Sequence, residues 1–313
     1  MNIALILITN FILSWTLTKF LIKPFKKIIP DIPNQRSSHN LIKPRGGGLS
    51  FLLTNLITSN IFNQVNFLSL IPLSLTGFAD DFLNISRRFR LVIQLTTSFF
   101  ILFESNYLDF IKNINYFGVE FLIIILLIFV CTGIINFCNF MDGIDGILSG
   151  SILTFYFFAA LIIPNSIWGI IGALIGFLIW NWQPSKIFMG DVGSNFLGGT
   201  LIWIILNTNN IDDSVALLFI ASPILIDPFI CLIRRFIAKK NIFKAHNMHL
   251  YQRLNKGGLS HQKVSLIYIL SMIFIGTSFF IGGLKLEIIS FICVLLIGFW
   301  LEKYYAGKFS KSS

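Results

Sequence analysis

The stretch Gly118–Gly146, GVEFLIIILLIFVCTGIINFCNFMDGIDG, decides how this chain folds. It opens with an apolar run near residues 118–135. A helix needs about 20 mostly apolar residues to cross a bilayer core about 30 Å thick, so this run predicts a transmembrane helix. The polar residues that follow are spaced three apart and are Asn136, Asn139, Asp142 and Asp145. A span that ends in acids and amides predicts a polar site at the membrane boundary.

The composition of the whole chain agrees with this stretch. The 313 residues are 55% hydrophobic and only 12% charged, whereas an ordinary soluble domain has about 25% charged residues. These values exclude a soluble globular protein, a disordered chain and a coiled coil. The four cysteines show no C-x-x-C spacing, so neither a disulfide framework nor a zinc site is predicted from them.

Apolar runs recur along the chain and predict an all-α, polytopic integral membrane protein with 10 to 11 transmembrane helices. We expect one membrane-embedded domain across residues 1–313. The second and third spans are the weakest, because both are short and Pro72 interrupts the third. The expected spans lie near residues 3–22, 48–62, 65–79, 91–108, 118–135, 147–163, 166–182, 194–208, 214–232, 263–281 and 286–302.

The basic residues favour eleven spans and give the bundle an orientation. The net charge is +10, and alternating the spans places 22 of the 24 Lys and Arg residues on one face, with only Lys112 and Lys285 opposite. By the positive-inside rule that face is cytoplasmic and the amino terminus starts outside. We expect no cleavable signal peptide, because no basic segment precedes the first apolar run.

Most unusual polar motifs lie on this same face. Asp80 and Asp81 end an apolar run, where one acid suits a divalent cation and the other a catalytic base; a helix-end cap is the alternative. The Asn136–Asp145 series predicts a polar helical stripe for a cation or a nucleotide, or else a seam between helices. Asp191, in Gly190-Asp-Val-Gly-Ser194, is expected in a tight loop that meets a metal or an anion, or in a simple turn.

Two basic motifs accompany the acids. Arg45 precedes three glycines, which is consistent with a flexible phosphate cradle, although the Lys-Ser/Thr ending of a P-loop is missing. His246 and His249 are one helical turn apart without a third metal ligand nearby in the sequence, which disfavours zinc. With Arg253 close by, a phosphate site is the better interpretation, and a solvated basic loop is the alternative.

These motifs leave several function classes open. Clustered acids and basic groups favour Mg²⁺-assisted transfer of a phosphoryl-linked group beside a lipid. A polytopic transporter for a lipid- or nucleotide-linked substrate is the alternative, for which Asp227 is the acid deepest in a span. A CDP-alcohol phosphotransferase needs D-G-x-x-A-R, which the sequence after Asp142 does not supply. Nucleic-acid binding is disfavoured, because the basic residues are divided among loops between spans.

Taken together and in this order, the motifs between about Asp31 and Leu254 resemble those of the polyprenyl-phosphate N-acetylhexosamine-1-phosphate transferases, glycosyltransferase family 4. The segment His246-x-x-His249-Leu-Tyr-Gln-Arg253-Leu is most similar to the branch that starts O-antigen or other cell-surface polysaccharide synthesis, rather than the phospho-MurNAc-pentapeptide transferases. The resemblance implies transfer of N-acetylhexosamine 1-phosphate from UDP-N-acetylhexosamine to polyprenyl (undecaprenyl) phosphate at the cytoplasmic face of the cell membrane. It also implies Mg²⁺, or Mn²⁺ in its place, and is compatible with a homodimer.

The resemblance assigns roles by motif. It implies that Asp80 activates the lipid phosphate with support from Asp81, that Asp191 and Asn139 bind the metal, and that Phe188 stacks on uracil. The other residues it places around the substrates are Asn136, Asp142, Asp145, Asn181, Arg90, Arg45, Arg36, His39, His246, His249 and Arg253.

Overall fold

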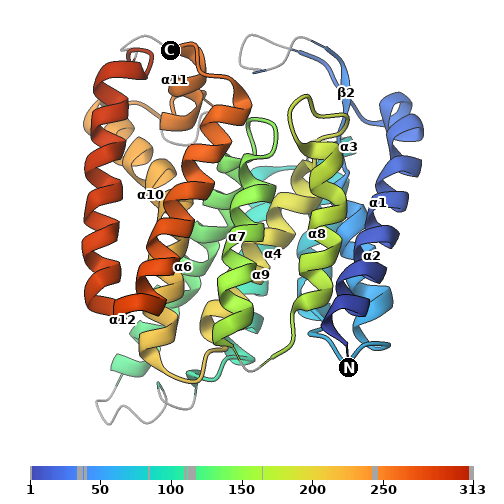
Figure 1. Cartoon of the computed structure of the whole chain (residues 1–313), viewed down its shortest axis with the longest axis horizontal. Coiled ribbons are helices and arrows are strands. Elements are labelled where there is room, and N and C mark those ends of the chain that lie inside the picture. The colour runs from blue at the N-terminus through green and yellow to red at the C-terminus, as the bar shows by residue number, and fades with distance from the viewer. Residues whose placement is uncertain are drawn as a thin grey trace.

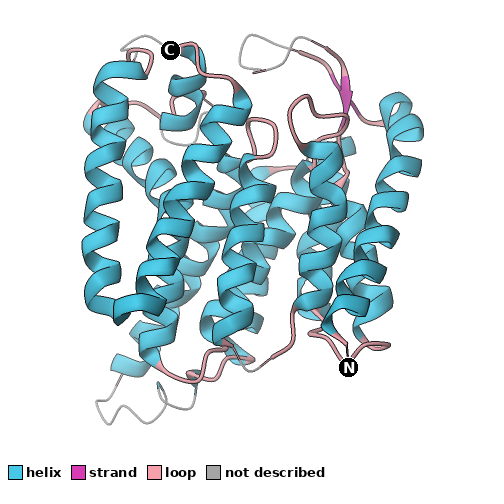
Figure 2. Cartoon of the chain, in the orientation of Figure 1, coloured by secondary structure: helices cyan, strands magenta, loops and turns pink. Residues whose placement is uncertain are grey.

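The computed structural model describes residues 2–33, 38, 41–83, 85–108, 111, 118–163, 165–241 and 246–309. Within them the chain forms a helical bundle with one short two-stranded ribbon (Figures 1 and 2). The elements are α1 (Ile3–Ile28), β1 (Pro30–Asp31), β2 (Lys43–Pro44), α2 (Gly48–Ser59), the 3-10 turn η1 (Leu68–Leu70), α3 (Ile71–Leu83), α4 (Arg87–Phe103), α6 (Val119–Met141), α7 (Ile147–Ile162), α8 (Trp168–Asn181), α9 (Gly190–Leu206), α10 (Ile211–Ile237), α11 (Leu250–Lys256) and α12 (His261–Tyr305).

Helices coincide with every expected span, so the prediction of an all-α polytopic membrane protein is confirmed. Four of the described helices, α1, α6, α10 and α12, are long and apolar enough to cross a membrane by themselves. The helices α2, α7, α8 and α9 are apolar but shorter. Helix α12 covers the last two expected spans as two helical segments, because non-helical backbone at Gly282 and Gly283 breaks it and the chain turns back on itself (Figure 1).

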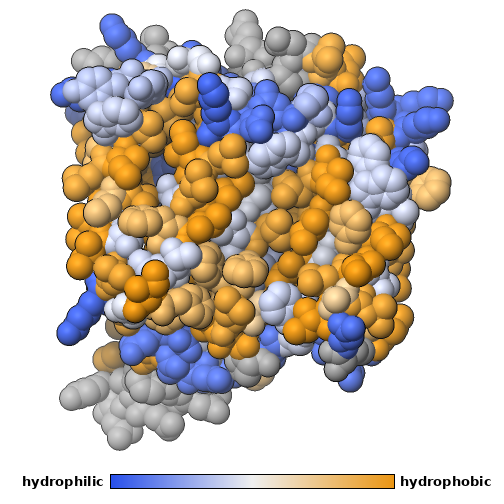
Figure 3. Space-filling view, viewed as in Figure 1, coloured by the Kyte–Doolittle hydropathy of each residue, from blue (hydrophilic) through white to orange (hydrophobic). Residues whose placement is uncertain are grey.

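The outer surface has the polarity of a membrane protein. On the face shown in Figure 3, a broad apolar belt crosses the middle of the bundle, and hydrophilic residues gather at its two ends. Many large apolar side chains are exposed on the surface, for example Phe20 at 75% and Ile281 at 79%. In water such exposure would be costly, but in a bilayer it is the lipid-facing surface.

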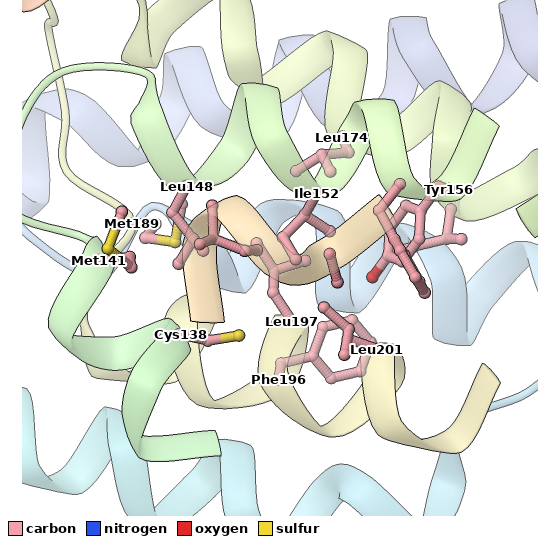
Figure 4. Close-up of a cluster of buried hydrophobic side chains, with 14 of the residues drawn as sticks. Cys138, Met141, Leu148, Ile152, Tyr156, Leu174, Met189, Phe196, Leu197 and Leu201 are labelled. Atoms are coloured by element: carbon pink, nitrogen blue, oxygen red, sulfur yellow. The ribbon is translucent and has the colours of Figure 1, made fainter. Parts of the chain in front are cut away.

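Helix α9 lies at the centre of the bundle, and most of its side chains are buried. Phe196, Leu197 and Leu201 on this helix pack with Ile152 and Tyr156 of α7 (Figure 4). Elsewhere small residues bring backbones together: a Cβ on Gly172 of α8 would lie 2.5 Å from the carbonyl oxygen of Leu7 in α1. Close backbone approach through small residues is a common way for helices to associate in membranes.

Three helix ends differ from the sequence expectation, and each difference moves a site residue. The predicted third span ends near residue 79, but α3 continues to Leu83 and carries both Asp80 and Asp81 in its last turns. Asp191 was expected in a loop, but α9 begins at Gly190, so Asp191 lies in its first turn. The predicted helical stripe is also shorter than expected, because α6 ends at Met141 and Asp142 is its C-cap.

Candidate active site

The end of α3 meets the beginning of α9, and this contact builds the acidic centre. Both carboxylate oxygens of Asp81 accept backbone N–H groups at the start of α9, from Asp191 at 3.1 Å and Val192 at 3.4 Å. Asp81 therefore caps α9, where a negative charge is favoured by the free N–H groups and the helix dipole. The two helices can approach because residue 77 is glycine: a Cβ there would lie 2.4 Å from the Asp191 carbonyl oxygen.

Asp191 is held from two sides. Its Oδ1 accepts a hydrogen bond from Asn139 Nδ2 at 3.0 Å, and its Oδ2 lies 3.2 Å from Nη1 of Arg90. The same Arg90 nitrogen also donates to Asp80. Asn139 Nδ2 donates a second hydrogen bond to Ser194 Oγ at 2.9 Å, which fixes the amide and leaves the side-chain oxygen Oδ1 to coordinate a ligand.

The charges around Asp191 fit a divalent cation. Arg90 pairs with both Asp80 and Asp191, and the backbone N–H of Asp191 at the start of α9 donates to Asp81. Burial raises the pKa of Asp142 well above its ordinary value, and the nearby Asp191 charge raises it further. Carboxylates crowded in this way repel one another, and a hard cation with oxygen ligands relieves that repulsion. The Asp191 carboxylate and the side-chain oxygen Oδ1 of Asn139 are the groups best placed to hold it.

The three glycines after Arg45 do not form the open phosphate cradle that their flexibility suggested. The N–H groups of Gly47 and Gly48 donate to the carbonyl oxygens of Phe188 and Met189, both at 2.9 Å. A Cβ on Gly48 would lie 2.3 Å from the Cα of Gly193. The glycines instead let this segment lie directly against the chain leading into α9, while the Arg45 side chain pairs with Asp31 at 3.1 Å.

A second polar group forms around Asp145, beside the acidic centre. Ser185 donates to the Asp145 carboxylate from its backbone N at 3.1 Å and from Oγ at 2.8 Å, and Lys43 Nζ lies 3.5 Å from it. Burial acts to raise the pKa of Asp145, but the hydrogen bonds from His261 and Ser185 and the charge of Lys43 hold it well below its ordinary value. Asp145 is therefore a fixed anion at neutral pH.

Lys43 connects this group to Phe188, since Nζ lies 5.1 Å from the centre of the Phe188 ring. A cavity of about 520 Å³ lies on the Asp145 side of Lys43 and is lined partly by Lys43, Asp145, Ser185 and His261. Phe188 is half-buried, and the Lys43 ammonium group lies over one face of its ring. The arrangement offers an aromatic surface beside fixed hydrogen-bonding groups, which suits a nucleobase.

In two predicted substrate residues, the nitrogen and the oxygen of the side-chain amide both form hydrogen bonds within the protein. Asn181 donates to the carbonyl oxygen of Ile187 at 3.0 Å and accepts from Ser149 at 2.7 Å. Asn136 exchanges hydrogen bonds with Gln94 at 3.0 and 3.2 Å. These contacts make Asn181 a support for the segment that carries Phe188 and make Asn136 a link between α4 and α6.

The histidine motif packs beneath the turn between α6 and α7. Tyr251 Oη donates to the carbonyl oxygen of Phe140 at 2.8 Å, and the His249 ring lies between the rings of Phe140, His246 and Tyr251. Burial, the neighbouring His249 and Arg235 lower the pKa of His246 to about 3. Burial and two arginines lower that of His249 to about 4. Both rings are therefore neutral at pH 7.

The structure supplies the third ligand that the sequence lacked: Cys231 of α10 lies beside His246 and His249, with donor atoms within 4.8 Å of one another. However, Arg235 acts on both histidines and donates to Met248 Sδ at 3.4 Å. A fixed positive charge opposes a second cation at the same place. The cluster therefore does not have the electrostatics of a metal site.

Arg253 makes contacts at the end of α12. Its guanidinium donates to Glu302 at 2.5 Å and to the carbonyl oxygen of Gly307 at 3.3 Å. Glu302 is also paired with Arg234, so Arg253 ties α11 to the end of α12, and its expected contact with diphosphate stays a prediction. Arg36 and His39 lie outside the described residues.

The site contains residues to which the sequence analysis gave no role. They are Lys43, Ser185, Ser194 and His261. Ser194 was available as part of the Gly190–Ser194 motif, one helical turn after Asp191. The other three lie outside the motifs, and only the packing of α8, α12 and β2 brings them to Asp145.

The fold and the site define a class: a multi-pass membrane protein whose span ends assemble carboxylates, amides and arginines into one centre. Comparison with known proteins gives the particular family. The model of glycosyl transferase family 4 matches residues 63–209. This range includes Asp80 and Asp81, the Asn136–Asp145 series and Asp191.

Three relatives illustrate the match. The chain is 29% identical to a probable undecaprenyl-phosphate N-acetylglucosaminyl 1-phosphate transferase of Bacillus subtilis, over 94% of this chain and 90% of the relative. It is 33% identical to an undecaprenyl-phosphate alpha-N-acetylglucosaminyl 1-phosphate transferase of Thermotoga maritima, over 77% and 79%. A phospho-N-acetylmuramoyl-pentapeptide-transferase of Rickettsia akari is 27% identical over 87% and 89%.

The chain belongs to glycosyl transferase family 4. It is a phosphoglycosyl transferase of the polyprenyl-phosphate N-acetylhexosamine-1-phosphate transferase family. The family predicted from the motifs is thereby confirmed, and the transporter alternative is not.

Proposed function

We propose that this chain transfers N-acetylhexosamine 1-phosphate from a UDP-N-acetylhexosamine to polyprenyl phosphate, giving polyprenyl-diphospho-sugar and UMP. The observation that carries the proposal is the meeting of Asp80, Asp81 and Asp191 with Arg90 at one end of a membrane-embedded bundle. Group transfer between two phosphates needs positive charge to offset the phosphate oxygens and a carboxylate to handle a proton. The lipid-facing belt gives a hydrophobic acceptor a route to this end.

In the proposed reaction, an oxygen of the acceptor phosphate attacks the phosphorus that carries the sugar. A new P–O bond forms, the bond from that phosphorus to UMP breaks, and UMP leaves with the electron pair. Asp80 accepts the proton from the acceptor when its phosphate is singly ionised. Asp81 maintains the start of α9, so that Asp191 stays opposite Asp80.

The proposed cofactor is Mg²⁺, with Mn²⁺ able to replace it. Asp191 and the side-chain oxygen Oδ1 of Asn139 would hold it, and when bound it would neutralise diphosphate charge. Arg90 contributes the same kind of stabilisation from the protein, because a guanidinium can pair with two phosphate oxygens at once.

The uridine is assigned to the group around Asp145, with Phe188 stacking on uracil. Lys43 joins this assignment, because it contacts both Phe188 and the Asp145–Ser185 pair. Asp142, at the turn between α6 and α7, is assigned to support the uridine pocket. His246 and His249 are assigned to the diphosphate or the sugar.

N-acetylglucosamine is the first sugar to test, since two of the relatives are named for it. The positive-inside distribution of basic residues favours a cytoplasmic active site. Initiation of O-antigen or another surface polysaccharide is the proposed pathway, and a homodimer remains a prediction.

The test is UMP release by purified protein in detergent, with undecaprenyl phosphate and a panel of UDP-sugars. We expect turnover with UDP-N-acetylglucosamine that requires Mg²⁺ or Mn²⁺ and disappears with EDTA. Asp191→Asn serves as the matched inactive variant. Undiminished turnover after chelation would contradict the metal assignment, and absence of lipid-linked product with every UDP-N-acetylhexosamine would contradict the reaction.

A further inference from the structure

Arg90 occupies a particular position in the acidic centre. It lies in the first turn of α4, and its Nη1 bonds both Asp80 and Asp191. The Arg90 side chain is 33% exposed, whereas Asp80 is 11% exposed. Among the described residues, the two acids are therefore the anionic partners of Arg90, and part of its side chain is open to the surroundings.

The contacts of Asp191 show what Arg90 competes with. One oxygen of Asp191 accepts from Asn139 and the other faces Arg90. The amide is neutral and fixed by Ser194, so it does not oppose a cation. Arg90 brings a full positive charge to the second oxygen, and two cations cannot share that place without mutual repulsion.

The other basic groups near the centre are engaged elsewhere. Arg45 pairs with Asp31, and Lys43 pairs with Asp145. Among the described residues, Arg90 is the basic side chain within ion-pair distance of Asp191.

We propose that Arg90 is an exchangeable counter-ion that couples metal binding to UDP-sugar binding. In the substrate-free site it neutralises Asp80 and Asp191. When a nucleoside diphosphate-sugar enters, Arg90 moves onto diphosphate oxygens, which suit its planar fork better than two separate carboxylates. Asp191 is thereby released to ligate the divalent cation. This inference rests on the proposed function, because it needs the metal at Asp191 and a diphosphate beside it.

Coupling of this kind is reciprocal: whatever removes Arg90 from Asp191 favours the cation, and the cation in turn favours the diphosphate. The free enzyme should accordingly bind the metal weakly by itself. Removing the Arg90 charge should make metal binding tighter while making nucleotide-sugar binding weaker, which loss of a purely structural residue would not do.

The experiment measures Mn²⁺ binding to purified protein by electron paramagnetic resonance, without nucleotide. We expect Arg90→Gln to bind Mn²⁺ about tenfold more tightly than wild type, a change of about 1.4 kcal/mol. Arg90→Lys, whose compact ammonium is less suited to bonding both acids, should lie between the two. Arg88→Gln is the matched control, because it removes the same charge from an exposed position on the same helix, and it should stay within about twofold of wild type.

Two further measurements locate the effect. The double variant Arg90→Gln/Asp191→Asn should lose the gain in Mn²⁺ affinity. Equilibrium binding of UDP-N-acetylglucosamine should weaken in Arg90→Gln and not in Arg88→Gln. Monodisperse elution in detergent checks that each variant is folded, and Arg90→Lys carries the test if Arg90→Gln does not fold.

Mn²⁺ binding by these variants distinguishes failure of the Arg90 counter-ion role from failure of the metal assignment at Asp191. Unchanged or weaker Mn²⁺ binding in Arg90→Gln, with binding still abolished by Asp191→Asn, would overturn the counter-ion role alone. A gain in affinity that survives Asp191→Asn would also overturn it, because the metal would then lie elsewhere. Mn²⁺ binding that Asp191→Asn leaves unchanged in the wild-type background would overturn the metal assignment itself.

Discussion

Two corners of the bundle bury aspartates in opposite ways. In the α10–α11 corner, Asp227 is 7% exposed and accepts three hydrogen bonds. They come from the backbone N–H groups of Leu250 at 2.7 Å and Tyr251 at 3.0 Å and from Tyr268 Oη at 2.6 Å. All three donors are neutral and fixed, so Asp227 caps α11 and joins it to α12.

In the α3–α9 corner, Asp80 and Asp191 share one arginine, and that arginine is partly exposed. Their partner is charged and movable, whereas every partner of Asp227 is a fixed neutral dipole. Burial of an acid within a span therefore does not by itself indicate chemistry. A structural acid is saturated by neutral donors, while a catalytic or metal-binding acid retains excess charge that a ligand can neutralise.

The largest expected effect is on activity in the α3–α9 corner. Asp191→Asn keeps the size of the side chain but removes the charge needed for the cation and the Arg90 pair. We expect turnover to fall about a thousandfold, as for loss of a group that stabilises transition-state charge. The midpoint of thermal unfolding in detergent should change little. A variant with normal UMP release would show that Asp191 is not at the reacting centre.

Asp227→Ala tests the other corner. Three buried donors lose their acceptor, so we expect the free energy of unfolding to fall by about 3 kcal/mol. Denaturant unfolding followed by tryptophan fluorescence measures it. Turnover per folded molecule should remain near wild type, and a large loss in turnover without a loss in stability would reverse the assignment of the two corners.

His249 gives the α10–α11 corner a dependence on pH. Its pKa is lowered to about 4 in the folded protein from about 6.5 in an unfolded chain. Between these values the unfolded state binds more protons, so stability is lost as pH falls from 6.5 towards 4. This residue alone should cost about 2 kcal/mol between pH 7.5 and pH 5. Unfolding measured across this range should show a shallower slope in His249→Gln, and Arg88→Gln should keep the wild-type slope.

The smallest effect is expected at the edge of the acidic centre. Lys43→Met removes the cation beside Phe188 and Asp145 and should raise KM for the UDP-sugar about tenfold, as for loss of one charged contact. Because Lys43 lies away from the transferred group, kcat should fall much less. Steady-state UMP release at varied UDP-sugar separates the two, and a selective loss of kcat would place Lys43 at the reacting phosphates instead.

The fold class was predictable because hydropathy acts locally. A run of about 20 apolar residues must cross the bilayer whatever its neighbours are. The family was predictable too, since the order of the acidic and histidine motifs is preserved in the linear sequence. Helix ends were less predictable: α9 starts earlier than expected because the Asp81 carboxylate, distant in sequence, satisfies its first N–H groups.

The roles of individual polar residues were also hard to predict, because they depend on contacts with elements distant in the sequence. Asp227 had the sequence signature of an ion path and proved to be a cap, because its donors come from α11 and α12. The glycines after Arg45 were consistent with a loop open to phosphate, and packing against Phe188 and Gly193 closes it. Lys43 had no signature, since a lysine in a basic loop does not reveal which acid it will reach.

Sequence alone predicts a bundle of membrane spans, a gathering of basic residues on one side of it, and the family that the motifs indicate. These properties depend on the local free energy of transfer into the bilayer and on motif order. The tertiary structure decided which acids are structural and which retain excess charge. That distinction depends on where hydrogen-bond donors from distant helices arrive, and only the packed bundle, with Asp81 at the start of α9 and Arg90 between Asp80 and Asp191, specifies it.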